Sequence, residues 1–237
     1  MTLDAELVAK GKGEPLEGVK AQGREHLTLI DKHPELKDFG WEDAGTTQLA
    51  KDVEFISTTE AARSEASDSS AIDTLTQEAR IDDSKKLVRS IRNVLPAALR
   101  KAKKDGVVID KKLLASGRLG RVVPAIVSYL TTVEPTVKRI DKYLQPYLKV
   151  VPSTRINEVR KALEAADTKQ EASLGATTEY TAKLNEAKGR VVEAIEELNG
   201  IAKNAFDGNA AVIGKFSKDL LLRARRERAA KEDPTKK

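Results

Sequence analysis

Two histidines, His26 and His33, are the side chains in this sequence best suited to metal binding or acid-base chemistry. Their seven-residue spacing could place both on one face of a helix, but Pro34 disfavours helical backbone at His33. The surrounding REHLTLIDKHPELKDFGW also lacks the HExxH pairing that holds zinc on a helix. We therefore expect ordinary surface or helix-end histidines, with no metal site.

The stretch GEPLEGVK, residues 13–20, approximates the glycine spacing of a phosphate-binding loop. Val19 stands where that loop requires lysine, and no predicted strand precedes it. The absence of cysteine excludes disulfides, thiolate metal sites and thiol nucleophiles. Carboxylates are numerous but lie among Lys and Arg, and no two of them are marked as an acid-base pair. We predict that the protein is not an enzyme and has no cofactor or small-molecule substrate.

Charge is distributed unevenly along the chain, although the formal net charge is only +5. Residues 52–83 contain nine acidic and two basic residues, whereas residues 85–121 contain twelve basic and two acidic ones. The C-terminal stretch adds a second basic cluster. The candidates for binding an anion or an acidic partner are Arg89, Arg92, Arg100, Lys103, Lys104, Arg223, Arg225, Arg226 and Arg228. Such clusters also occur on ordinary solvated surfaces, and positive charge alone does not distinguish DNA, RNA and acidic protein.

The elements that carry these residues are predicted to be helices. Aromatic residues make up 4% of the sequence, so the core must consist mainly of Leu, Ile, Val and Ala. From Ile156 to Ala205, steps of alternately three and four residues meet an apolar residue or alanine at most positions. This pattern predicts a coiled-coil-like helix about 75 Å long. Ser153 is its predicted N-cap, and the glycines within it weaken it by about 1 kcal/mol each.

A second long helix is predicted from about residue 46 to residue 104, with Ile72 and Leu75 in its apolar pattern. Residues 57–71, STTEAARSEASDSSA, have the composition of a linker. Their small residues keep helical spacing, however, and we favour a helix that a neighbour can approach closely. The helix at 156–205 has a matching polar zone, which indicates side-by-side packing there or a diverged duplication. At residues 82–84 the spacing skips, which predicts a kink or a new helix start.

Between the long helices, Pro124, Pro135 and Pro146 recur at intervals of eleven residues, about three helical turns. One alternative is a single helix kinked repeatedly on one face, and the other is three short helices that each begin near a proline. Either gives a bent helical segment. Its predicted inner stripe is Ile126, Leu130, Val133, Val137, Ile140, Leu144 and Leu148.

Three regions are predicted: a short N-terminal helical region at 1–45, an elongated bundle at 46–207, and a basic C-terminal helix and tail at 208–237. An apolar group near the end of the first region consists of Leu27, Ile30, Leu36, Phe39 and Trp41. Such a group more often closes a bundle end than binds a ligand. We also consider Trp41 a candidate anchor for a partner.

No apolar run reaches signal-peptide or membrane-span length. The sequence therefore predicts a soluble, cytoplasmic protein for which a membrane is not the expected partner.

The sequence favours an all-α, elongated helical bundle with two long coiled-coil-like helices and a proline-bent segment between them. Long helices with small-residue seams and separated charges suit assembly better than catalysis. The leading hypothesis is a structural or scaffolding protein that forms a homo-oligomer or binds a protein partner. The alternative is a nucleic-acid-binding protein that uses residues 85–121 and the C-terminal arginines. A helical membrane-active protein is a weaker alternative.

The three-four pattern can be tested at Leu184 and Leu198. If both side chains are buried in a helix seam, replacing either with alanine removes about 2–5 kcal/mol from the free energy of unfolding. Urea denaturation of the two variants measures this loss. A neutral result at either position would show that the register is wrong there.

Overall fold

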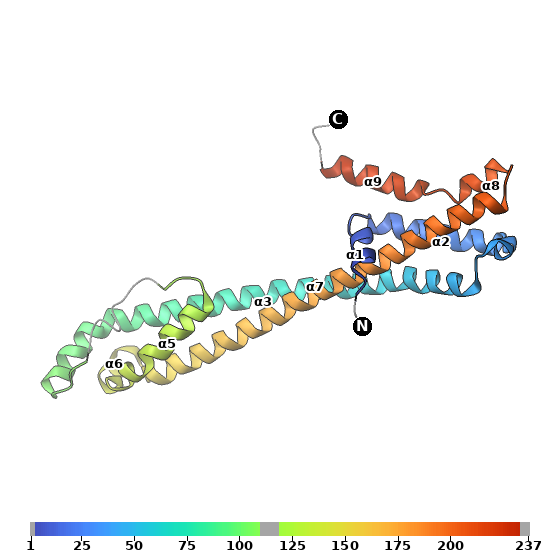
Figure 1. The fold of residues 1–237 in the computed structure, drawn as a ribbon. Helices are drawn as coiled ribbons and strands as arrows, with labels where there is room; N and C mark the ends of the chain where they lie inside the picture. The colour runs from blue at the N-terminus through green and yellow to red at the C-terminus, as the bar shows by residue number, and fades with distance from the viewer. Residues whose placement is uncertain (1–2, 110–118, 233–237) are drawn as a thin grey trace. The chain divides into compact units, whose positions relative to one another are not determined.

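The fold is all-α in the computed structural model, which describes residues 3–109 and 119–232 (Figure 1). No β-strand occurs within those two ranges, which confirms the predicted fold class. The elements are α1 (Ala5–Lys12), α2 (Leu16–Lys32), a 3-10 helix η1 (Pro34–Phe39), α3 (Asp43–Lys104), α5 (Val123–Lys138), α6 (Asp141–Leu148), α7 (Pro152–Ala205), α8 (Ala210–Lys215) and α9 (Asp219–Glu232).

Helix α3 is continuous over 62 residues, so residues 57–71 are helical and not a linker. Hydroxyl groups of its small polar side chains donate hydrogen bonds to backbone carbonyls of the same helix. Thr74 Oγ1 donates to the Ser70 carbonyl at 2.8 Å, and Ser84 Oγ donates to the Arg80 carbonyl at 2.8 Å. The helix also continues through residues 82–84, so the predicted new start does not occur there.

Helix α7 confirms the second long helix, but its first turn differs from the prediction. It begins at Pro152, which places Ser153 inside the helix and not at the N-cap. The Ser153 N–H donates to Asp141 Oδ1 at 3.0 Å, and the Ser153 hydroxyl donates to the same carboxylate. Asp141 of α6 therefore satisfies a free backbone donor at this helix start, a role that local sequence assigned to Ser153.

The proline-containing segment combines features of both predicted alternatives. Pro124 lies in the first turn of α5, whereas Pro135 and Pro146 lie inside α5 and α6. The bend between these helices is at Ile140, whose φ of -119° and ψ of 13° depart from helical values. The predicted inner stripe is confirmed, because its residues from Ile126 to Leu144 are buried and Leu148 packs against the same core.

The chain divides into two compact units, each with a core of its own. Unit 1 comprises residues 1–66 and 176–237, and unit 2 comprises residues 67–175. Both boundaries fall within α3 and α7, so each long helix contributes to both cores. Leu184 and Leu198 are buried in the core of unit 1, as their spacing predicts.

In unit 2, α3 and α7 pack side by side at their small-residue segments, as predicted. The Asp73 side chain is only 2% exposed, and its carboxylate accepts from Lys169 Nζ at 2.8 Å and Ser173 Oγ at 2.5 Å. This inward position of Asp73 turns the neighbouring apolar residues outward. Ile72 is 62% exposed and Leu75 is 66% exposed, so their predicted place in the core is wrong.

Close backbone contacts at glycine organise unit 1. At Gly189 in α7, an added Cβ would lie 2.1 Å from the Leu7 carbonyl oxygen of α1. Gly11 makes the reciprocal approach to α7, where a Cβ would lie 1.9 Å from the Asn185 carbonyl oxygen. Gly18 of α2 likewise faces Ala224 of α9. These glycines permit helix approaches that any side chain would block.

Two glycines of α7 give a matched test of this packing. Gly189→Ala places a methyl group against the α1 backbone and should cost about 1–3 kcal/mol of stability. Gly200→Ala meets no atom within 4 Å and should stabilise the helix by about 0.5–1 kcal/mol. Denaturant titration compares the two variants, and changes of the same sign would contradict the assigned contact.

Candidate functional site

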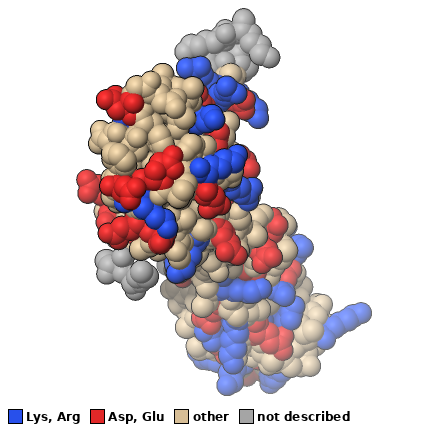
Figure 2. Space-filling model, turned by 90° about the vertical axis from the view of Figure 1, so that its right-hand side faces the viewer, with Lys and Arg blue, Asp and Glu red and all other residues tan. Residues whose placement is uncertain are grey.

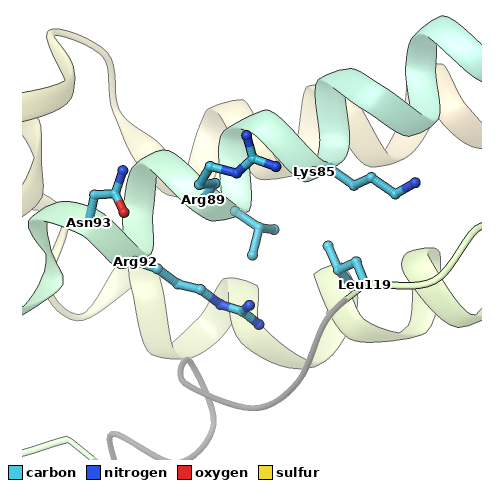
Figure 3. Close-up of a pocket in the computed structure, with 6 residues that line it drawn as sticks. Lys85, Arg89, Arg92, Asn93 and Leu119 are labelled. Carbon is cyan, nitrogen blue, oxygen red and sulfur yellow. The ribbon is translucent and has the colours of Figure 1, made fainter.

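The basic part of α3 forms one wall of a cavity in unit 2. The cavity has a volume of about 270 Å³ and is lined by Lys85, Val88, Arg89, Arg92, Asn93 and Leu119. Lys85, Arg89 and Arg92 share one helix face because they are four and three residues apart. Leu119, from the segment that precedes α5, lies across from them (Figure 3).

The three cations of this cavity are held differently. Arg92 Nη2 donates to the Tyr129 hydroxyl at 3.1 Å, and its guanidinium lies 5.7 Å from the centre of the Tyr129 ring. These contacts direct Arg92 toward α5. Arg89 is exposed and Lys85 is half-buried, and neither forms an ion pair with another described residue. Two cations that pair with no carboxylate among the described residues thus lie beside one fixed cation, an arrangement that suits a phosphate or carboxylate group.

The structure thus brings together only part of the predicted basic surface. Arg89 and Arg92 line the cavity together with Lys85 and Asn93, which were not among the predicted candidates. Their helical spacing from Arg89 and Arg92 was the available signal. Arg100, Lys103 and Lys104 are exposed nearer the end of α3. Residues 110–118 of the predicted basic range lie outside the described residues.

The C-terminal arginines belong to unit 1, and one of them has a structural role. Arg225 Nε donates to Glu14 Oε2 at 2.8 Å, and its Nη2 donates to the other oxygen of that carboxylate. The hydrogen bonds to Glu14 raise the pKa of Arg225 and tie α9 to the α1–α2 connection. The remaining candidates, Arg223, Arg226 and Arg228, are exposed along α9.

A buried lysine lies at the same connection. Lys188 is 6% exposed, and its Nζ donates to the Glu14 carbonyl at 3.0 Å. Burial, reinforced by the charge of Arg228, lowers the pKa of Lys188. The carbonyl of Glu14 and its carboxylate therefore satisfy Lys188 and Arg225 respectively, which assigns both cations to packing within unit 1.

Trp41, the candidate partner anchor, is part of the core of unit 1. The side chain is 3% exposed, its Nε1 donates to Thr46 Oγ1 at 2.9 Å, and its ring packs on Gly45. A residue so covered offers no surface to a partner in this arrangement. Phe39, in the same apolar group, is instead 48% exposed.

The two histidines do not form a metal site. His26 is fully buried, with Nδ1 3.0 Å from the Gln22 carbonyl and Nε2 3.3 Å from the Phe216 carbonyl. His33 Nδ1 lies 3.1 Å from Glu35 Oε1. No group of three or more potential metal-ligating His, Cys, Asp or Glu side chains occurs in the described part of the chain. His26 instead connects α2 to the segment between α8 and α9.

A second hollow, in unit 1, was not indicated by the sequence. It is a groove of about 920 Å³ between α3 and α7, with the exposed ring of Phe55 on its wall. Asp52 is buried within it and pairs with Arg190 at 2.8 Å. Helical periodicity predicts buried stripes well but gives no signal for a hollow left by side chains of unequal size.

One exposed face of α3 is more informative. Stepping alternately by three and four residues through unit 2 meets only exposed side chains, which we call the α3 stripe. The α3 stripe is Asp68, Ile72, Leu75, Ala79, Asp82, Lys86, Arg89, Asn93, Pro96 and Arg100. Its charged residues change from acidic to basic along the helix. On the face drawn in Figure 2, Lys and Arg side chains are interspersed with Asp and Glu.

No protein-family model matches this chain, and comparison with curated proteins and with solved structures found no match. No helix in the described residues combines the length and apolar character needed to cross a membrane.

The buried position of His26 predicts a pH dependence of stability. Burial lowers the pKa of His26 below its ordinary value of 6.5, so the unfolded chain takes up a proton before the folded chain does. This contribution to stability is complete above pH 6.5 and declines as the pH falls below it. His26→Gln should lose less stability than the parent between pH 7.5 and 5.5 in urea titrations. Equal losses would contradict the assignment, since other titrating groups are common to both proteins.

Proposed function

We propose that this protein is a structural or scaffolding protein that acts by self-association, with the α3 stripe as its contact surface. The observation that carries the proposal is the combination of exposed apolar residues and opposite charges on one helix face. Ile72 and Leu75 are more than half exposed, with an acidic stripe residue on each side and the basic ones further along the helix. Large apolar side chains left at the surface beside ordered charges are typical of interaction surfaces.

The magnitudes favour a weak association in which charge selects the partner. Complete burial of an exposed Leu or Ile contributes about 1.5–3 kcal/mol. Association itself costs about 4–15 kcal/mol in lost translational and rotational freedom. Ile72 and Leu75 from each of two copies barely offset that cost. The complementary charges of the stripe must therefore determine which surfaces meet, and salt must weaken the complex.

Nucleic-acid binding is the second candidate, and the cavity of Lys85, Arg89 and Arg92 favours it. Three cations around a hollow suit a phosphate group, and Arg100, Lys103 and Lys104 could contact neighbouring phosphates. The exposed acidic residues of the same face would oppose a long polyanion, which is why we place this function second. Self-association requires the acidic residues of the stripe, whereas nucleic-acid binding is opposed by them.

Charge reversal separates the two functions. Self-association predicts a mass above 25.9 kDa by light scattering at low salt, decreasing past about 0.15 M salt. Arg89→Glu with Arg100→Glu should disperse the assembly, and adding Asp68→Lys should partly restore it. Asp73 is not used because its carboxylate is buried. Lys161→Glu, exposed on α7 and outside the stripe, is the control and should change nothing.

Nucleic-acid binding predicts another pattern in the same variants. Absorbance at 260 nm should copurify with the parent and disappear in the arginine variants. Asp68→Lys should not rescue binding in these variants, since phosphates remain negative. A parent that stays monomeric at every salt concentration and carries no nucleic acid would contradict both functions.

A further inference from the structure

We propose that two copies of this chain associate through the α3 stripe in antiparallel orientation, about a two-fold axis at the level of Ser84. This inference rests on the proposed function and adds the partner, a second copy, and the register. It starts from the spacing of the stripe. Outward from residue 84, stripe residues occur at distances of two, five, nine, twelve and sixteen residues in both directions. When a second copy of the helix runs in the opposite direction about residue 84, every stripe position therefore lies opposite another stripe position. A two-fold interface requires this match.

This symmetry pairs residues of suitable chemistry. A residue at position i of one copy faces position 168 − i of the other. The pairs are Asp82 with Lys86, Ala79 with Arg89, Leu75 with Asn93, Ile72 with Pro96, and Asp68 with Arg100. Each pair occurs twice in the dimer. Both aspartates meet a cation, Ile72 meets Pro96, and the aliphatic part of Arg89 covers Ala79. Leu75 meets the polar Asn93, and no like charges meet.

The residues that flank the stripe agree with this register. Asp83 of one copy lies beside Lys85 of the other, and Glu78 lies beside Ser90. All four side chains are at least partly exposed in the single chain. The three-four spacing is also that of a coiled-coil seam, which lets two helices stay in contact over several turns.

Other arrangements of the same two helices lose the complementarity. A parallel, in-register pair places Asp68 on Asp68, Asp82 on Asp82 and each cation on itself. Moving the antiparallel register by one heptad places Lys86 on Arg89 in one direction. In the other direction it places Ile72 on Arg89 and leaves both aspartates without a cation. Of these three antiparallel registers, only the one about Ser84 pairs both aspartates with a cation and brings no like charges together.

Single charge reversals test the antiparallel pairing by mixing. Asp68→Lys alone sets a second cation against Arg100 twice in a homodimer, and Arg100→Glu alone sets a second carboxylate against Asp68 twice. Each variant should associate about ten-fold more weakly than the parent, or worse, by analytical ultracentrifugation. An equimolar mixture should recover association, because the mixed dimer contains one Lys-Glu pair and one Arg-Asp pair. Glu171→Lys mixed with Lys161→Glu is the control, since both lie on α7 outside the stripe, and it should match the parent throughout.

Spin labels measure the register directly, because the chain has no native cysteine to label. Thr76→Cys and Lys101→Cys are exposed positions beside the stripe, eight and seventeen residues from Ser84. At 1.5 Å per residue, the axial separations between equivalent labels in the dimer are about 24 Å and about 51 Å. A parallel in-register pair would instead give short, nearly equal distances at both positions.

The outcomes distinguish the antiparallel register from self-association itself. Recovery on mixing together with the two label separations supports the antiparallel register. Association without recovery, or with equal label distances, overturns the register and leaves self-association standing. A monomeric parent overturns both.

Discussion

The buried carboxylate of Asp73 fixes the rotation of α3, and the exposed surface of unit 2 follows from that rotation. Lys169 and Ser173 both bond to this carboxylate at the seam between α3 and α7. The two hydrogen bonds lower the pKa of Asp73, and the one from Lys169 has the larger effect. A buried carboxylate without such partners would be costly, so the helix cannot turn to bury Ile72 instead without leaving Asp73 to be satisfied elsewhere. The polar seam thus keeps an apolar pair at the surface.

Small side chains make this polar seam possible. Serine, alanine and threonine along residues 57–74 of α3 allow close approach, and their hydroxyls can bond to the helix backbone without a partner from outside. Unit 1 solves the same problem with glycine, since Gly11 and Gly189 place two helix backbones in direct contact. In both units, helices approach each other closely because the side chains at the contact are small or absent. This packing agrees with a sequence poor in aromatic residues.

The helices were largely predictable from the sequence, and the surface was only partly so. The three-four spacing of α7 and the apolar stripe of α5 and α6 follow from local pattern, because burial repeats with the helix period. Ile72 and Leu75 were predicted to face inward, because an apolar side chain is a stronger local signal for burial than a carboxylate. The partners that allow the Asp73 carboxylate to be buried lie about a hundred residues away. Asp141 at the start of α7 and Tyr129 beside Arg92 are likewise long-range partners that no local pattern specifies.

Arg89 belongs both to the α3 stripe and to the basic cavity, so the two candidate functions share a side chain. In the antiparallel register, its guanidinium would lie over Ala79 of the second copy and near the acidic residues around it. A phosphate held in the cavity would recruit the same guanidinium and reduce the positive charge available to that copy. If both proposals hold, anion binding and self-association would oppose each other by linkage, because each would draw on the charge of Arg89.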